Sequence, residues 1–169
     1  SGLWLFIGVM VLAFTSVSMN FFDEVFTPTV SALSPFAPSP FDQPAPKVRG
    51  PDRIGFRRAL AIGEQDAAGR GLDWRPASLS YVPDRNLYGV MFTASGKVAY
   101  RKLGPVSLYL DGASGAFVYA DDPYADSNGR KLSRALYPLH SGEVAGPIGV
   151  ATIFLLGFAT AEMCVSGFY

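Results

Sequence analysis

The sequence predicts a membrane α-helical protein with two transmembrane helices and a small α+β extramembrane domain between them. Two long apolar runs are the main observation. Residues 3–22 contain no Asp, Glu, Lys, Arg or His, and residues 148–168 contain a single charge, that of Glu162. At about 1.5 Å per residue, each run can cross a hydrocarbon core of roughly 30 Å as one helix. Two buried helices of a soluble core are the alternative interpretation.

The composition and the charge balance support a membrane protein and exclude some partners. The 169 residues are 49% hydrophobic and only 17% charged, which is a low charged fraction for a soluble domain. A formal net charge of zero at pH 7 argues against a nucleic-acid partner. The lone Cys164 lies in the second run, so it cannot form an internal disulfide and is expected to be a small packing residue.

The two ends suggest a part of a longer polypeptide. The first span, expected over 3–22, lacks the basic residues that precede the apolar core of a cleaved signal peptide. The chain begins with Ser1, and no Lys or Arg follows the second span, expected over 148–169. All 14 Lys and Arg lie between the two runs, in a segment too long for the positive-inside rule to orient the chain.

Residues 23–51 are predicted to form a proline-rich extended strap. Proline fixes the backbone angle φ and removes an N–H donor, so a dense series favours a semi-rigid segment that follows a surface. Recognition by a proline-binding module is the functional alternative. The prolines of this segment are Pro28, Pro35, Pro38, Pro40, Pro44, Pro46 and Pro51.

Residues 52–130 are predicted to form a small α+β domain that starts with a helix. Asp52 is a suitable N-cap, and Gly69 or Gly71 can end the helix. Three apolar residues fall near one face of this helix, namely Phe56, Leu60 and Ala67.

Strand-like stretches follow the helix. Ala77–Val82 and Leu87–Ala94 flank the sequence PDRN, which is a good turn. Val106–Ala120 divides at its Asp and Gly residues into the two strands of a hairpin. The alternating apolar residues of VSLYL indicate a sheet with one covered face, which the preceding helix is expected to cover.

Residues 131–147 lead back to the membrane through a short helix and a loop. In the sequence RKLSRALYPLH, Leu132, Leu136 and Leu139 have the spacing of one helix face. The chain then continues as HSGEVAG, which is rich in small residues and contains its only histidine, His140.

Three stretches in this order resemble the PepSY-associated transmembrane protein family. The run LAFTSVSMNFFDEVFTPTV is similar to the family's span rich in small and hydroxylated residues, which exits into a proline-rich segment. The hairpin YLDGASGAFVY resembles the PepSY pattern of strand, Asp, Gly-containing turn and strand. YPLHSGEVAGPIG, leading into ATAEMCVSGFY, is similar to the family's His-x-Gly start of a span that ends near a Ser/Thr-Gly-aromatic step.

The resemblance implies a bacterial inner-membrane protein in which residues 23–147, with the PepSY-like domain, lie on the periplasmic side. Some relatives are ferric-siderophore reductases that carry b-type haem between their helices, and others are iron-regulated membrane proteins. The family's histidine at the start of this span is a candidate haem-iron ligand, and it corresponds to His140.

The chain departs from the haem-carrying relatives in having no second histidine. A second axial ligand from this chain would have to be a thioether, from Met10, Met19 or Met163. Packing is the more common role of a methionine in a span. The resemblance otherwise implies a ligand from missing sequence or from another subunit. The expected partners are therefore the lipid bilayer and other membrane subunits.

His140 is the main candidate site residue. A neutral imidazole suits haem iron, and its other ring nitrogen needs a hydrogen-bond partner. Gly142 and Gly146 lack side chains, so a flat macrocycle or a neighbouring helix can approach them closely. The alternative is that His140 is an interfacial polar residue and that both glycines serve helix packing.

Two polar residues of the spans are further candidates. An ionised Glu162 inside the membrane costs roughly 2.5–3.5 kcal/mol, so it is expected to be protonated, paired or turned toward a polar interior. A proton relay and an inter-helix hydrogen bond are both open as its role. Glu162 shares a helical stripe, expected to face protein, with Thr152, Leu155, Ala159 and Ser166. Asn20 ends a polar cluster of the first span and is expected to serve packing, capping or the edge of a cofactor. The other members of that cluster are Thr15, Ser16 and Ser18.

Common catalytic motifs are missing from the sequence. It contains no phosphate-binding Gly-rich loop, no His-Glu-x-x-His and no Cys-x-x-Cys, and DDPYADSNG lacks the spacing of a calcium loop. The leading hypothesis is a component of a haem-containing ferric or ferric-siderophore reductase system. The alternative is a non-catalytic accessory or scaffold subunit that docks through its periplasmic domain and two spans. Modulation of a peptidase is a third hypothesis.

Overall fold

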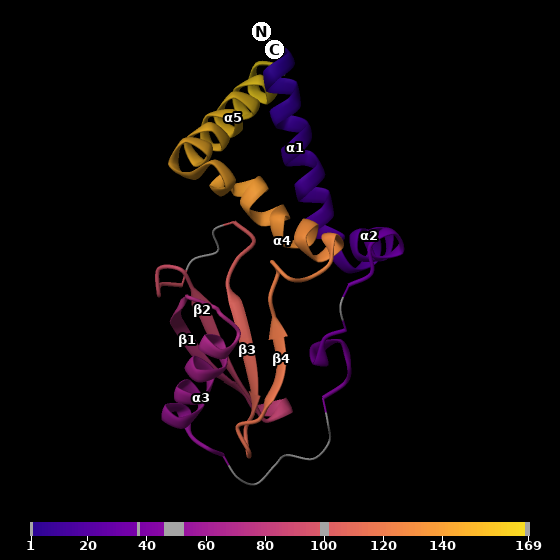
Figure 1. Cartoon of the computed structure of the whole chain (residues 1–169). Helices are drawn as coiled ribbons and strands as arrows, with labels where there is room; N and C mark the ends of the chain where they lie inside the picture. Colours follow the sequence, from indigo (N-terminus) through magenta and orange to yellow (C-terminus); the bar gives the residue numbers. More distant parts are fainter. Residues whose placement is uncertain (1, 37, 46–52, 99–101, 168–169) are drawn as a thin grey trace. The chain divides into compact units, whose positions relative to one another are not determined.

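The computed structural model of the chain describes residues 2–36, 38–45, 53–98 and 102–167. The chain divides into two compact units (Figure 1). The sheet unit comprises Ala37–Tyr100 and Gly104–Asp126. The helical unit comprises Ser1–Phe36, Arg101–Leu103 and Ser127–Tyr169.

The sheet unit contains one antiparallel sheet with the strand order β1-β2-β3-β4. Its strands confirm the expected strand pair and hairpin closely. The PDRN turn forms the short 3-10 helix Pro83–Arg85, after which Asn86 takes a left-handed conformation that Asn tolerates well. The strands are Arg75–Val82 (β1), Leu87–Thr93 (β2), Val106–Asp111 (β3) and Phe117–Asp121 (β4).

Helix α3 (Phe56–Gly69) packs on one face of the sheet (Figure 1). Its inner face consists of small residues, so the helix axis lies close to β2. A Cβ atom added at Gly63 would lie 2.7 Å from Cγ2 of Val90. The structure corrects one detail of the expected helix, because its N-cap is Gly55, while Asp52 lies outside the described residues. Phe56 is more than half exposed, although its ring meets that of the core residue Tyr88 edge to face at a centroid distance of 5.3 Å. The buried core residues of this unit are Ala59, Ala67, Tyr88, Val90, Phe92, Val106, Leu108 and Leu110.

The second part of the proline-rich segment, at residues 40–43, contacts the face of the sheet that is opposite to α3. The ring of Phe41 meets that of Tyr109 edge to face, with a centroid distance of 4.8 Å. The guanidinium of Arg85 donates hydrogen bonds to the carbonyl oxygens of Pro40 and Gln43. The side chains of Leu108 and Leu110 alternate with that of Tyr109 along β3, so the segment lies on the face that α3 does not cover.

The helical unit begins with α1 (Gly2–Asn20), the π-helical turn Phe22–Phe26 and α2 (Thr27–Leu33). Residues 23–33 are therefore helical, which corrects the expectation of an extended strap from residue 23. The physical reason is the position of Pro28 in the first turn of α2, where its missing N–H removes no helical hydrogen bond. The unit ends with α4 (Asn128–Ser141), the 3-10 turn Glu143–Ala145 and α5 (Gly146–Ser166).

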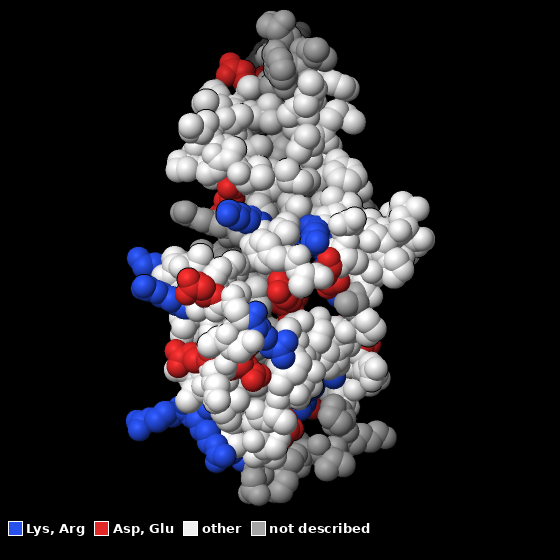
Figure 2. All heavy atoms as spheres, viewed as in Figure 1, with Lys and Arg blue, Asp and Glu red and all other residues white. Residues whose placement is uncertain are grey.

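The helical unit contains one clear candidate membrane span among the residues described. Glu143–Ser166 is long and apolar enough to cross a membrane, and only 6% of its apolar stretch is buried in the protein. The first apolar run passes the same test only when Phe6–Asn20 and Phe22–Leu33 are combined, and these two helices bend by 90°. The expectation of two spans is thus supported for the second run and remains unconfirmed for the first. Figure 2 shows that the surface over α1 and α5 is almost free of charged side chains on the face in view.

Candidate functional site

His140 lies in the last turn of α4, a helix that packs against α1. Ser127 caps the start of α4, because its hydroxyl accepts a hydrogen bond from the N–H of Arg130 at 3.2 Å. Pro138 lies inside the helix and cannot donate a helical hydrogen bond. Gly142 then ends the helix with a φ of 78°, which favours glycine. The local sequence therefore ends α4 directly after the histidine.

The imidazole of His140 contacts a hydroxyl group of the first apolar helix. Nδ1 of His140 lies 2.9 Å from Oγ1 of Thr15, a residue 125 positions earlier in the chain. The Thr15 side chain is fully buried, with 0% exposure, and the His140 side chain is half-buried. Thr15 and Ser18 are the buried polar residues of α1 and lie on the same helix face. The sequence contained this hydroxyl cluster, but it held no signal that would pair Thr15 with His140.

The two glycines predicted to flank a cofactor have different surroundings. Gly142 lies against α5, since a Cβ atom at Gly149 would lie 2.0 Å from the carbonyl oxygen of Gly142. This is the close approach of two helices that the packing interpretation describes. Gly146 has no atom within 4 Å of the position of a Cβ. It lies at an open depression of about 490 Å³ that is lined by Glu143, Gly146, Pro147, Val150, Ala151 and Phe154.

The face of α5 that contacts its own chain differs from the expected stripe. A Cβ atom at Gly142 would lie 2.8 Å from Cγ1 of Ile153, and one at Gly8 would lie 2.7 Å from Cδ2 of Leu156. The stripe through Glu162 was expected to face protein, but of its five residues only Ala159 is half-buried and the others are exposed. The face of α5 that contacts the other helices is set by glycines, because these residues permit a close approach of two backbones.

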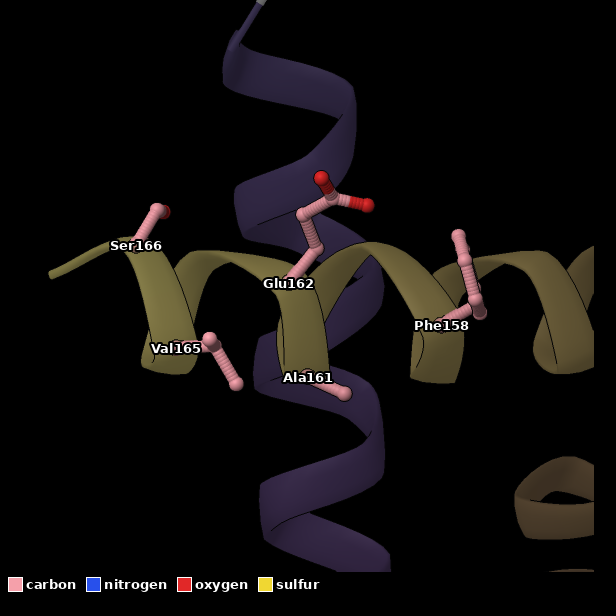
Figure 3. A pocket seen from close by; sticks show the side chains of 5 residues that line it. All are labelled: Phe158, Ala161, Glu162, Val165 and Ser166. Atoms are coloured by element: carbon pink, nitrogen blue, oxygen red, sulfur yellow. The ribbon is translucent and has the colours of Figure 1, made fainter.

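Glu162 lies on an exposed side of α5. Figure 3 shows its carboxylate on the same side of the helix as Phe158 and Ser166, while Ala161 and Val165 lie on the other side. These five residues line an open depression of about 500 Å³. Among the described residues, the carboxylate of Glu162 makes no hydrogen bond or ion pair.

The remaining candidates of the spans serve local contacts. The side-chain amide of Asn20 donates to the carbonyl oxygen of Ser16 at 2.8 Å, which is a bond within its own helix. Two of the three candidate thioether residues, Met10 and Met163, are more than half exposed, and Met19 is 38% exposed. No group of three or more His, Cys, Asp and Glu that could hold a metal ion occurs in the described part of the chain.

The PepSY-like hairpin of the sheet unit forms a stabilised turn. Oδ1 of Asp111 accepts hydrogen bonds from the hydroxyl and the backbone N–H of Ser114, both at 2.7 Å, and from the N–H of Ala113 at 3.1 Å. The side-chain and backbone hydrogen bonds of Ser114 lower the pKa of Asp111 from its ordinary value of 3.8. This carboxylate therefore orders the loop between β3 and β4.

The comparison with known families agrees with this description. The family model of the PepSY-associated TM region matches residues 1–169. No curated protein matches the chain. The match covers the apolar helices, the hairpin and His140 together, so the apolar helix Glu143–Ser166 belongs to a membrane protein. The chain is a member of the PepSY-associated TM region family.

Proposed function

We propose that this chain is the membrane-anchoring and extracytoplasmic part of a haem-containing ferric or ferric-siderophore reductase system. The observation that carries the proposal is the contact between Nδ1 of His140 and the buried hydroxyl of Thr15. Histidines that bind metals use one ring nitrogen as the ligand and donate the N–H of the other to a hydrogen-bond acceptor, and a hydroxyl oxygen is able to accept such a bond. Nε2 of His140 makes no hydrogen bond with a described residue. His140, held by Thr15, therefore fits the role of a ligand that would hold haem iron.

His140 is the residue of this chain that would hold the iron. A bound haem would supply a one-electron centre between the two sides of the membrane. The sequence contains a single histidine, so any further imidazole ligand would have to come from outside it. We place the protein in the bacterial inner membrane with residues 23–147 on the periplasmic side, and Met10, Met19 and Met163 outside the ligand set.

The absorption spectrum of the native protein, purified from membranes in mild detergent, tests this function. The expected spectrum contains the bands of a b-type haem, and the variant His140→Ala loses them while keeping its helical content. Met163→Leu is the matched control, because it removes a candidate thioether and is expected to leave the bands unchanged. A native preparation without haem, from cells that make haem normally, would contradict the proposal.

A non-catalytic accessory subunit is the second candidate function, and one observation favours it. Glu162 is exposed on an apolar helix and has no partner among the described residues, so a membrane environment requires a proton or a polar partner on another helix. This function predicts that other membrane proteins co-purify with the chain and that Glu162→Gln weakens their retention. Co-purification of a stable partner together with a colourless preparation would select this function over the first.

A further inference from the structure

The hydroxyl of Thr15 has one hydrogen atom and three polar neighbours. Oγ1 lies 2.8 Å from the carbonyl oxygen of Val11, 3.1 Å from that of Leu12 and 2.9 Å from Nδ1 of His140. All three distances are within hydrogen-bond range. The side chain is fully buried, so water does not replace any of these contacts.

Counting donors and acceptors assigns the proton between Thr15 and His140. The two carbonyl oxygens can only accept a hydrogen bond, whereas a ring nitrogen of a neutral imidazole either donates or accepts. If the Thr15 hydroxyl donated to Nδ1, its lone pairs would face the carbonyl oxygens of Val11 and Leu12 without a hydrogen between them. If it donates to the carbonyl of Val11, as Thr in a helix commonly does, a lone pair remains for an N–H of His140. The second arrangement therefore gives both of the shorter contacts, at 2.8 Å to Val11 and 2.9 Å to His140, one donor and one acceptor each.

We propose that Thr15 is a positioning residue that holds neutral His140 in the Nδ1–H tautomer and leaves Nε2 with a free lone pair. An unconstrained neutral histidine prefers the opposite tautomer, with the proton on Nε2. The contact therefore inverts the intrinsic preference and directs the ligand atom of the ring away from α1. The choice of Nε2 as an iron ligand rests on the proposed haem function, but the tautomer itself does not.

The low dielectric around the contact favours a well-defined tautomer. Thr15 is buried in an apolar helix, and a hydrogen bond in such surroundings is electrostatically stronger than one in water. A buried hydroxyl or N–H without a partner is correspondingly costly. Both effects favour the arrangement in which each donor has an acceptor.

The tautomer is measurable directly because His140 is the only histidine. The full chain is prepared without haem in lipid nanodiscs with ¹⁵N-labelled histidine, at a pH where the NMR spectrum shows a neutral ring. The expected spectrum has the directly bonded proton on Nδ1. Thr15→Val is expected to move the tautomer ratio toward Nε2–H by about two- to tenfold, which is the effect of one net hydrogen bond. Thr15→Ser, which keeps a hydroxyl, restores the ratio of the unchanged protein.

Thr152→Val is the matched control. Thr152 also lies in an apolar helix and donates to the carbonyl four residues earlier, that of Ile148, at 2.8 Å, but it has no imidazole partner. Its replacement is expected to leave the ratio unchanged. A proton on Nε2 in the unchanged protein would overturn the inference, and this result does not depend on whether any variant folds. A folded Thr15→Val protein with an unaltered ratio would overturn it as well.

The same samples separate this inference from the proposed function. An Nδ1–H tautomer in a protein that never takes up haem supports the inference and contradicts the haem proposal. If haem is added back and binds, Thr15→Val is expected to weaken its affinity about tenfold or more, as the loss of the hydrogen bond to a metal-binding histidine does. Haem binding with full affinity in Thr15→Val, together with an Nε2–H tautomer in the unchanged protein, would leave the function standing and overturn the role of Thr15.

Discussion

The two units of the protein differ in how far their large apolar side chains are exposed. In the sheet unit, Val90 and Leu110 are 0% exposed and belong to a continuous apolar core. In the helical unit, the fully buried Thr15 lies on α1, while Ile148 and Phe154 of α5 are 79% and 73% exposed. Water drives apolar side chains inward, but lipid does not. The difference indicates that the sheet unit folds against water and the helical unit against lipid.

The difference also explains which interactions determine each unit's structure. The sheet unit is held by the burial of large apolar residues between α3 and the sheet. The described part of the helical unit uses close backbone contacts at Gly142 and Gly149 and a polar contact between Thr15 and His140. Small residues and buried hydrogen bonds are the usual means of helix association in a membrane. Truncation of a large apolar side chain should therefore be severe in the core of the sheet unit and mild on the exposed surface of α5.

The largest expected effect follows from Leu110→Ala in the sheet unit. Leu110 is fully buried, so its truncation leaves a cavity and is expected to lower the free energy of unfolding by about 2–5 kcal/mol. The measurement is urea unfolding of the full chain in detergent, followed by the fluorescence of Trp74 in a Trp4→Phe background for the sheet unit and by helical circular dichroism for the helical unit. Phe154→Ala is the contrasting change in the helical unit, with an expected effect within about 0.5 kcal/mol. Equal losses of unfolding free energy from Leu110→Ala and Phe154→Ala would contradict the difference between the two units.

Gly149→Ala is expected to be the most damaging small change in the helical unit. The added methyl group would lie 2.0 Å from the carbonyl oxygen of Gly142, so α4 and α5 must separate. Overpacking of this kind costs about 1–3 kcal/mol. Thermal unfolding in lipid nanodiscs, followed by helical circular dichroism, measures the loss. Gly157→Ala is the matched control on the same helix, because no atom lies within 4 Å of its Cβ position, and it should leave stability unchanged or slightly raised.

The smallest expected effect concerns Asp111 and depends on pH. Asp111→Ala removes the hydrogen bonds to Ser114 and is expected to cost about 1 kcal/mol at pH 7. The pKa of Asp111 is lower in the folded chain than its ordinary value of 3.8, so its stabilisation is present above pH 3.8. It is lost as the pH falls through the still lower folded-state pKa.

The measurement for Asp111 is the stability difference between the unchanged protein and the variant at several pH values. This difference should be constant near neutral pH and should shrink below about pH 3.8. Asp73→Ala is the control, because Asp73 is exposed and makes no hydrogen bond with a described residue of the sheet unit, and it should show no such dependence. A stability difference between the unchanged protein and Asp111→Ala that grows toward acidic pH would contradict the prediction.

The sequence predicted the sheet unit in more detail than the helical unit. Strand alternation and the PDRN turn depend on neighbouring residues, so β1 to β4 could be placed from local patterns. The inner face of α3 could not be predicted from local patterns, because the fit of Gly63 against Val90 is a contact between distant segments. The bend after α1 was also missed, since the prolines of this stretch suggested an extended segment although Pro28 starts a helix.

The candidate site could be predicted only in part. The single histidine before an apolar run and its small neighbours identified His140 without any structural information. Its partner Thr15 could not be identified, because 125 residues separate the two and neither local periodicity nor composition links them. The orientation of Glu162 was likewise beyond a single sequence, because the contact face of α5 depends on Gly8 and Gly142.

The collision rates of spin labels in membranes test the central claim, that the two units face different solvents. The native Cys164 is replaced by Ser, and a label is attached at Leu155→Cys in α5 or at Val118→Cys in β4, both exposed positions. The account predicts that the label at 155 collides often with oxygen, which dissolves in lipid, and rarely with a water-soluble nickel chelate, and that the label at 118 shows the reverse. Free access of the nickel chelate to position 155 would contradict the account.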